Sequence, residues 1–288
     1  LGVPCYELFG GKVRDQVRVY WSHCGTWRIS RGDIYPPAVK NLDDVRTLGK
    51  EVRERGFTAA KTNIFRQTQE GLVGWNPGFN GRDDPGRMPP RKVLEGLQEY
   101  LAAFREGLGP DVDILLDLNF NARTEGYLSL IRALADHDIF WIEIDTPHAP
   151  ALATIRSQSP FTISGCESLT GLVEFLPYFQ KEALDVAIID AVWIGIWQSL
   201  KIAAAADAFQ VNVAPHNYYG HLATLMNGHF CTSVPNLKIM ETDIDRAPED
   251  AEIFTHEPEI VDGQLIVPDR PGWGTEPRED AFSKFPAT

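Results

Sequence analysis

Three apolar runs in the middle of the chain each lead to a carboxylate. The acids are Asp117, Glu143 and Glu167, and the runs that precede them cover residues 114–116, 140–142 and 161–163. The acids are 26 and 24 residues apart, which leaves room for a strand, a crossover helix and loops between each pair. A single acid at a strand end is usually a helix cap, but capping does not explain three at one βα spacing. Parallel strands would bring these hard oxygen ligands to one edge, where they suit Mg²⁺.

Two later strand ends carry groups for acid–base chemistry. Ile188-Ile189 leads to Asp190, and Val213-Ala214-Pro215 leads to His216. On adjacent strands, Asp190 would orient the imidazole of His216 and raise its pKa. A lone histidine is more often structural, but an aspartate one strand back favours a general base that removes a proton acidified by the metal.

Two more polar groups follow apolar runs. Lys61 and Asn63 end the run that starts at Phe57, and alternation along a strand points both the same way. Most lysines are solvated, but this one should face a barrel mouth that holds three carboxylates. Glu241 ends the last run, at residues 237–240.

Strand-like and helix-like segments alternate along the chain, which is typical of an α/β fold with a parallel sheet. The predicted strands cover residues 17–20, 57–61, 112–116, 140–142, 161–163, 186–189, 211–214 and 237–240. The predicted helices cover residues 42–55, 91–105, 125–136, 169–179 and 199–209, whereas 192–197 is apolar without a clear period. At 288 residues and 43% apolar content, the chain suits one TIM-like (β/α)₈ barrel.

Two segments do not fit the repeating pattern. Residues 67–90 are rich in Gly, Pro, Asn and Asp and too long for an ordinary βα connection. They are predicted to form either a loop that covers the substrate or a surface excursion packed by Trp75 and Phe79. The barrel is expected to span residues 16–245, and the proline-rich residues 246–288 to form an extended return segment away from the barrel core.

Composition excludes several classes of partner. A net charge of −13 and a pI near 5.0 argue against a nucleic-acid or anionic-membrane surface. The four cysteines show no paired spacing, and no apolar run reaches the ~18 residues of a membrane span. The expected compartment is the cytoplasm, although the chain opens at Leu1 without a methionine.

In this order and spacing, the motifs resemble the mandelate racemase/muconate lactonizing enzyme branch of the enolase superfamily. The resemblance is carried by Gly10-Gly11-Lys12, Lys61-Thr62-Asn63, Asp117-Leu118-Asn119, Trp141-Ile142-Glu143, Cys166-Glu167-Ser168, Asp190, Ala214-Pro215-His216-Asn217, Glu241 and Pro271-Gly272-Trp273-Gly274.

The resemblance implies a role for each motif. Asp117, Glu143 and Glu167 carry over as Mg²⁺ ligands, and Asp190 with His216 as the dyad that abstracts the proton α to a carboxylate. Lys61 and Glu241 would assist at the substrate's carboxylate, and the residues expected to touch the substrate are Ser22, His23, Asn63 and Asn119. The common step is formation of an enediolate stabilised by electrostatics.

One departure separates the reactions of the family. Racemases of this branch carry a Lys-x-Lys pair whose second lysine is the opposing base, and that position is Asn63 here. We therefore predict a hydro-lyase that removes water from an aldonic or aldaric sugar acid. The acid for the leaving hydroxyl is open between His216 acting twice and His23, since Asn119 stands where some dehydratases have a histidine. The alternatives are a racemase, epimerase or cycloisomerase on similar acids, and a metal-binding barrel without catalysis.

Relatives also carry an N-terminal capping domain that closes over the barrel mouth. Residues 1–15 are expected to be its remnant, so that the chain is either a fragment or a barrel served by another polypeptide. By resemblance, a homo-oligomer is expected.

Overall fold

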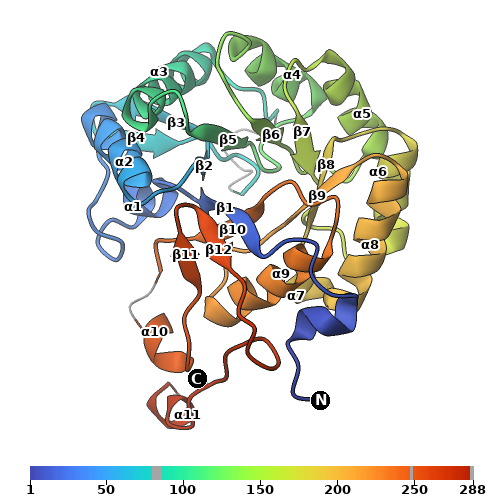
Figure 1. Cartoon of the computed structure of the whole chain (residues 1–288). Helices are drawn as coiled ribbons and strands as arrows, with labels where there is room; N and C mark the ends of the chain where they lie inside the picture. The colour runs from blue at the N-terminus through green and yellow to red at the C-terminus, as the bar shows by residue number, and fades with distance from the viewer. Residues whose placement is uncertain (80–85, 247–248, 286–288) are drawn as a thin grey trace.

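The computed structural model describes residues 1–79, 86–246 and 249–285, and eight parallel strands form a closed barrel at its centre (Figure 1). The strands are β1 (Gln16–Ser22), β2 (Ala59–Thr62), β5 (Asp113–Asp117), β6 (Trp141–Glu143), β7 (Ile163–Gly165), β8 (Val186–Ile189), β9 (Asn212–Pro215) and β10 (Met240–Asp243). They pair in chain order from β1 to β9. β10 pairs with β1, and a bridge between Val213 and Leu237 closes the ring. The predicted (β/α)₈ barrel is confirmed.

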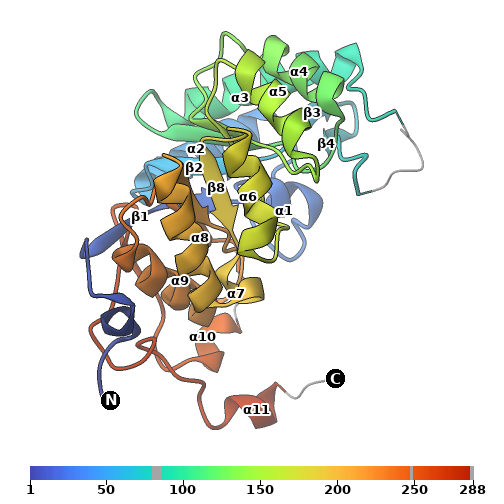
Figure 2. The same cartoon turned by 90° about the vertical axis from the view of Figure 1, so that its right-hand side faces the viewer.

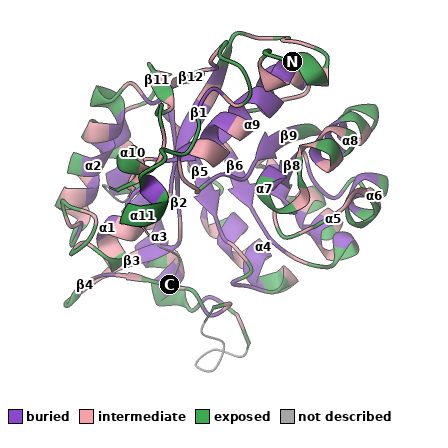
Figure 3. Cartoon of the chain, turned by 90° about the horizontal axis from the view of Figure 1, so that it is seen from below, coloured by how far each residue is buried: buried purple, intermediate pink, exposed green. Residues whose placement is uncertain are grey.

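Helices surround the barrel, and most of them bury the face turned toward it and expose the other, whereas α9 (His221–Ser233) has no exposed residue (Figure 3). The longer ones are α2 (Leu42–Glu54), α3 (Arg91–Leu108), α4 (Thr124–Ala133), α5 (Ala149–Gln158), α6 (Leu172–Gln180), α8 (Ile196–Ala208) and α9 (His221–Ser233). In α2 the buried residues are Val45, Leu48, Gly49 and Val52, the spacing of an amphipathic helix. The side chain of Asn41 caps its N-terminus by accepting from two backbone N–H groups.

A second cluster of buried residues fills the inside of the barrel. It contains Tyr20, Ala59, Leu115, Trp141, Val186, Ile188, Ala214 and Ile239, which come from β1, β2, β5, β6, β8 and β9 and, for Ile239, from the position directly before β10. Tyr20 and Trp141 meet edge to face with ring centroids 5.6 Å apart. Since strand side chains alternate, these residues pack the interior while their neighbours contact the helices.

Several elements differ from the predicted ones. Residues 65–74 form a hairpin of β3 (Phe65–Thr68) and β4 (Gly71–Gly74) where a loop was expected from residue 67, and α5 was not predicted at all. The aperiodic stretch 192–197 covers all but the first residue of α7 (Ala191–Ile194), a break at Gly195 with φ 78°, and the start of α8. Residues 80–85 of the predicted long loop lie outside the described part of the chain.

The C-terminal segment attaches to the barrel rather than only returning past it. β11 (Glu259–Val261) and β12 (Gln264–Ile266) form a hairpin, and β12 pairs antiparallel with the first residues of β1. Leu265 is fully buried there. The remaining helices are short: η1 (Cys5–Phe9), α1 (Thr26–Ser30), α10 (Asp250–Ile253) and α11 (Ala281–Lys284). The N-terminus and α11 lie on the same side of the barrel in Figures 1 and 2. In the described residues, no helix combines the length and apolar character needed to cross a membrane.

Candidate active site

A cavity of about 700 Å³ opens at the C-terminal ends of the barrel strands. Its walls include His23, Lys61, Asn63, Asp117, Glu167 and His216, which follow or end five different strands. The hairpin β3–β4 and the residues after it, among them Trp75 and Phe79, form one side of the opening. Phe79 packs against Phe120 with ring centroids 4.4 Å apart, and both line the cavity, so the predicted long segment does reach the edge of this cavity.

His216 is held in one orientation by Asp190. Asp190 follows β8 and its Oδ1 accepts hydrogen bonds from the backbone N–H groups of Val192 and Trp193, which caps α7. Its Oδ2 lies 2.7 Å from Nδ1 of His216, which follows β9. Nε2 therefore faces the cavity and lies 3.4 Å from Oε2 of Glu167. Burial by itself lowers the pKa of His216, but the hydrogen bond to Asp190 and the charges of Glu241 and Glu167 outweigh it and raise that pKa.

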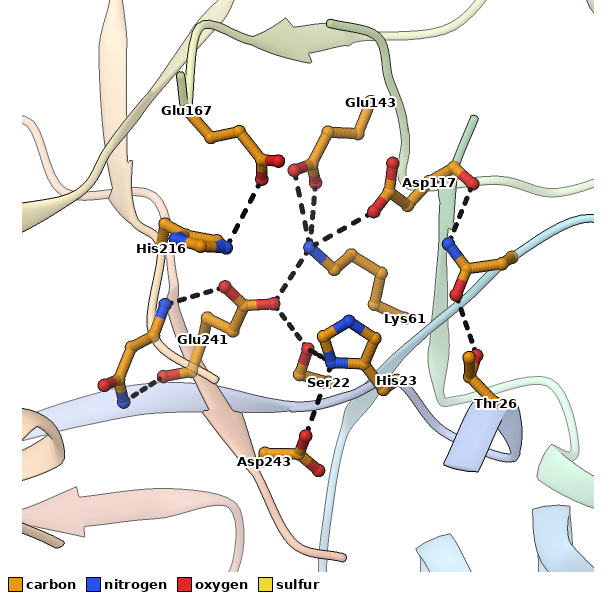
Figure 4. A network of polar contacts seen from close by, with 12 residues as sticks. Ser22, His23, Thr26, Lys61, Asp117, Glu143, Glu167, His216, Glu241 and Asp243 are labelled. Carbon is orange, nitrogen blue, oxygen red and sulfur yellow. Dashed lines mark hydrogen bonds and ion pairs between the residues drawn. The ribbon is translucent and has the colours of Figure 1, made fainter. Parts of the chain in front are cut away.

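Lys61 lies among carboxylates at the centre of the mouth (Figure 4). Its Nζ is 2.9 Å from Glu241, 3.3 Å from Glu143 and 3.8 Å from Asp117. Burial opposes the charge, but the attraction of Glu143 and Glu241 raises the pKa of Lys61 well above its usual range. The lysine is a fixed cation here and not a base.

Glu241 is the most fully bonded of these acids. It accepts hydrogen bonds from the hydroxyl of Ser22 and, at 2.7 Å, from the backbone N–H of Asn217. Burial acts to raise its pKa, but the charges of Lys61, His216 and His23 and the hydrogen bond from Ser22 together outweigh burial and hold that pKa below the usual range.

Asp117, Glu143 and Glu167 come to the same end of the barrel because β5, β6 and β7 are parallel neighbours. As they stand, no three His, Cys, Asp or Glu side chains within the described ranges are close enough together to hold a metal ion, and Lys61 lies between two of these acids. Burial, followed by the charges of neighbouring carboxylates, raises the pKa of Glu143 and Glu167 well above the usual range, although Lys61 and His216 oppose this. Carboxylate oxygens are the donors that a divalent cation prefers, so the chemistry of the three acids, rather than their present spacing, fits such an ion.

Of the residues predicted to touch the substrate, His23, Asn63 and Asn119 line the same cavity, whereas Ser22 is fully buried and does not. Asn63 donates to the backbone carbonyl of Asp117 and to Oδ1 of Asn119, each at 3.2 Å. Asn119 in turn donates to both carboxylate oxygens of Asp117, through its backbone N–H at 2.7 Å and its side chain at 2.8 Å. These amides fix the orientation of a proposed metal ligand rather than simply facing solvent.

Three non-glycine residues at this end have left-handed backbone conformations. They are His23 (φ 45°), Asn119 (φ 47°) and Cys166 (φ 88°), the last directly before Glu167. Such conformations cost free energy and persist where the surroundings impose them, often at functional sites.

Sequence reasoning missed four residues of the site. Tyr219 donates a hydrogen bond to Asp190, and Asn217 supports Glu241 through backbone and side chain. Asp243 pairs with His23, and Asp145 adds a buried carboxyl whose pKa is raised to about 7 by burial and by the charges of Glu143 and Asp117. Asp145 and Asp243 each stand two residues after an identified acid, which was the available signal.

Comparisons with known proteins agree with this arrangement. Residues 44–281 match the family model described as "Enolase C-terminal domain-like". The chain is 28% identical to D-gluconate dehydratase of Thermoproteus tenax over 100% of its own length and 53% of that protein. It is also 28% identical to a D-galactonate dehydratase family member of Streptomyces bingchenggensis, over 99% of this chain and 69% of that one.

A solved structure is more similar. It is described as a "putative L-alanine-DL-glutamate epimerase" from Burkholderia xenovorans strain LB400 bound to magnesium and fumarate. It superposes with a TM-score of 0.97 at 55% identity, covering 100% of this chain and 72% of that one. The matched family model, the barrel and the order of its strand-end residues together place this chain in the mandelate racemase/muconate lactonizing enzyme branch of the enolase superfamily, of which it contains the C-terminal barrel domain.

Proposed function

We propose that this protein removes the proton α to a carboxylate and then eliminates a β-hydroxyl as water, acting on an aldonic or aldaric acid. The observation that carries the proposal is the state of Lys61. Its ammonium is buried and paired with Glu241 and Glu143, so it cannot accept a proton. Asn63, where racemases of this branch have a lysine, cannot accept one either. A lysine-based two-base racemisation is therefore disfavoured, and elimination with His216 as the base is favoured.

His216 is suited to the first step. Asp190 holds Nδ1, so Nε2 is presented to the cavity and stabilised as it gains a proton. Glu241, fixed by Lys61, Ser22 and Asn217, would orient the substrate's carboxylate together with Lys61. Asp117, Glu143 and Glu167 would hold Mg²⁺, which when bound draws negative charge from the carboxylate and acidifies the α-proton.

The relatives support two parts of the proposal. The structure from Burkholderia xenovorans contains magnesium and fumarate, which agrees with a divalent metal and a small carboxylic acid as ligands. The curated relatives at 28% identity are a D-gluconate dehydratase and a D-galactonate dehydratase family member. The description of the 55% identical structure favours a second candidate, epimerisation of a substrate such as a dipeptide.

Proton NMR in D₂O with Mg²⁺ separates these functions. The panel contains aldonic acids, aldaric acids and L-alanyl-glutamate epimers. For a dehydratase we expect the C2 proton signal to disappear together with the growth of a new signal from C3 of a 2-keto-3-deoxy acid. His216→Asn should lower the rate of C2 proton loss and the rate of product formation by about 10²- to 10⁴-fold, the usual contribution of a general base.

The control is His137→Asn, because His137 lies outside the cavity in the connection that leads into β6. This variant should keep wild-type rates. If the proton α to the carboxylate exchanges and only an epimer forms, the dehydratase proposal is replaced by the second candidate, epimerisation. No exchange with any member of the panel would overturn both and leave a metal-binding barrel.

A further inference from the structure

The barrel mouth holds a second imidazole–carboxylate pair besides His216 and Asp190. His23 directly follows β1, and Asp243 ends the neighbouring strand β10. Nδ1 of His23 lies 3.3 Å from Oδ2 of Asp243 and 3.0 Å from the hydroxyl of Ser22. The pair thus repeats the arrangement of the first dyad, a histidine after one strand and an aspartate at the end of its parallel neighbour.

Asp243 is itself held firmly. Its Oδ2 accepts a hydrogen bond of 2.7 Å from the indole N–H of Trp27, and its Oδ1 accepts one of 3.2 Å from the backbone N–H of Asp245. The side chain is only 4% exposed. A buried carboxylate with fixed donors is well placed to orient the imidazole of His23 through its Nδ1.

The other nitrogen of His23 is therefore the one available for chemistry. The side chain lines the cavity and is 20% exposed, and Nε2 makes no hydrogen bond to any of the described residues. In Figure 4 the ring nitrogen without a dashed line points away from Asp243. The ring packs on Trp27, with centroids 4.9 Å apart, which restricts its rotation.

His23 is also close to the first dyad. The ring of Tyr218 lies 5.6 Å from the ring of His23 and 5.1 Å from the ring of His216, between centroids. One substrate molecule in this cavity can therefore reach both imidazoles. The left-handed backbone of His23 indicates that the fold imposes this position at a cost.

We propose that His23, oriented by Asp243, is the general acid that protonates the leaving β-hydroxyl. The inference rests on the proposed dehydration and assigns its second proton transfer. His23 would be a catalytic residue that touches the leaving oxygen, and Asp243 a positioning residue that acts through it. This resolves the choice left open by the sequence between His23 and His216 acting twice.

The proton and electron balance is complete without another reactant. Nε2 of His216 takes the C2 proton, and the electrons of that C–H bond move first into the carboxylate, as the enediolate, and then form the C2=C3 double bond. The C3–O bond breaks with its electron pair as Nε2–H of His23 gives its proton to that oxygen, so water leaves. The enol then takes a proton at C3 and loses the one on its C2 oxygen, which gives the 2-keto-3-deoxy acid. His23 is reprotonated and His216 deprotonated by exchange with solvent.

A change of leaving group tests this role directly. Fluoride departs without needing a proton, so a 3-deoxy-3-fluoro analogue of an aldonic acid that the wild type dehydrates bypasses the acid. In His23→Asn we expect elimination of water to fall by about 10²- to 10⁴-fold, while fluoride release changes less than about 10-fold. Exchange of the C2 proton in D₂O should continue. Asparagine is the chosen replacement because it tolerates a left-handed backbone.

Asp243→Asn provides the test of the positioning residue. It should lower kcat for water elimination with little change in KM, and it should leave fluoride release near the wild-type rate. A residue that only supports the fold would affect both substrates alike.

The outcomes separate this inference from the function on which it rests. If His23→Asn lowers water and fluoride elimination equally, or lowers neither, His23 is not the acid, although the dehydratase proposal stands. If the wild type eliminates neither water nor fluoride from any acid, the proposed function fails and the role of His23 fails with it.

Discussion

Lys61 is the residue on which the charge balance of the barrel mouth depends. It is buried and it pairs with two carboxylates that are fully buried, Glu143 and Glu241. Removing one partner from a buried ion pair leaves an uncompensated charge, which costs more than the pair itself contributes. The lysine is therefore expected to stabilise the fold as well as to bind the substrate's carboxylate.

Lys61→Met should lower the free energy of unfolding by about 3 to 5 kcal/mol, because Glu143 and Glu241 lose their cation while remaining buried. Urea unfolding followed by circular dichroism measures the change. Lys50→Met is the matched control, since Lys50 is exposed on α2, and it should change the free energy of unfolding by less than about 0.5 kcal/mol. Equal stability of the two variants would contradict a structural role for Lys61.

Single residues also show where sequence reasoning succeeded. Asp190 and His216 were paired on the assumption that consecutive strands are neighbours, and in the structure they lie 2.7 Å apart. Asp243 and Tyr219 were missed because neither terminates a distinct apolar run. Asp243 meets His23 because β10 pairs with β1, and Tyr219 reaches Asp190 from the loop after β9, and neither contact follows from a local pattern.

Among the elements, α2 and α3 pack with their backbones in close approach at two glycines, Gly49 and Gly107. A Cβ on Gly49 of α2 would lie 2.7 Å from the backbone of Gly107 and Leu108 in α3, nearer than real Cβ atoms come. The two glycines let the helix backbones touch, and α3 follows the hairpin that forms one side of the mouth. Glycine is needed at residue 49 because of this close packing, and not because the backbone turns there.

Gly49→Ala should therefore lower the free energy of unfolding by about 1 to 3 kcal/mol, the range for overpacking. The sign of this change distinguishes the two cases, because replacing a helix glycine by alanine without such a contact would raise the free energy of unfolding by roughly 0.5–1 kcal/mol. Thermal or urea unfolding gives the answer. Gly171→Ala is the control, since its Cβ would meet nothing within 4 Å and the change should stay below about 1 kcal/mol.

The elements whose apolar residues repeat at a regular spacing were predicted from the sequence, and those without such a repeat were not. α2 and α3 have clear apolar faces and were found within a few residues of their ends. α5 buries only Ala149, Leu152 and Ile155, and its first turn contains Pro150, so its sequence has little helical pattern. The β3–β4 hairpin turns at Gln69-Glu70, which lacks the usual Asn-Gly signal of a tight hairpin.

At the scale of the whole molecule, His229 of α9 packs against one residue near the start of the chain and one near its end. Its ring stacks on Tyr6 with centroids 5.3 Å apart and meets Trp273 at 5.6 Å. Its Nδ1 accepts a hydrogen bond of 3.3 Å from the backbone N–H of Tyr6. Burial lowers the pKa of His229 from 6.5 to about 4, so the histidine is neutral in the folded protein at neutral pH.

This depressed pKa predicts a loss of stability in mild acid. Below pH 6.5 the unfolded chain takes up a proton at this residue, whereas the folded protein does so only near pH 4. Folding should therefore lose roughly 2–3 kcal/mol from this residue as the pH falls from 6.5 to 4, and none of that loss is expected above pH 7. His229→Gln removes the titration.

Urea unfolding at pH 7.5 and pH 5.0 checks this prediction. The drop in the free energy of unfolding between the two values should be smaller in His229→Gln than in the wild type, even though the variant is less stable at pH 7.5. His256→Gln serves as the control, because His256 is exposed, and it should show the wild-type drop. An equal drop in all three proteins would show that His229 does not titrate as inferred.

The sequence alone determined the barrel and the identity of most groups at its mouth. Strand and helix patterns are local, and successive parallel strands necessarily bring residues 117, 143, 167, 190 and 216 to one end. Only the tertiary structure decided that Lys61 lies between the carboxylates, that His23 pairs with Asp243, and that the hairpin at 65–74 borders the cavity. Those contacts join residues far apart in the chain, and they depend on side-chain direction, strand register and closure of the ring, which no local pattern encodes.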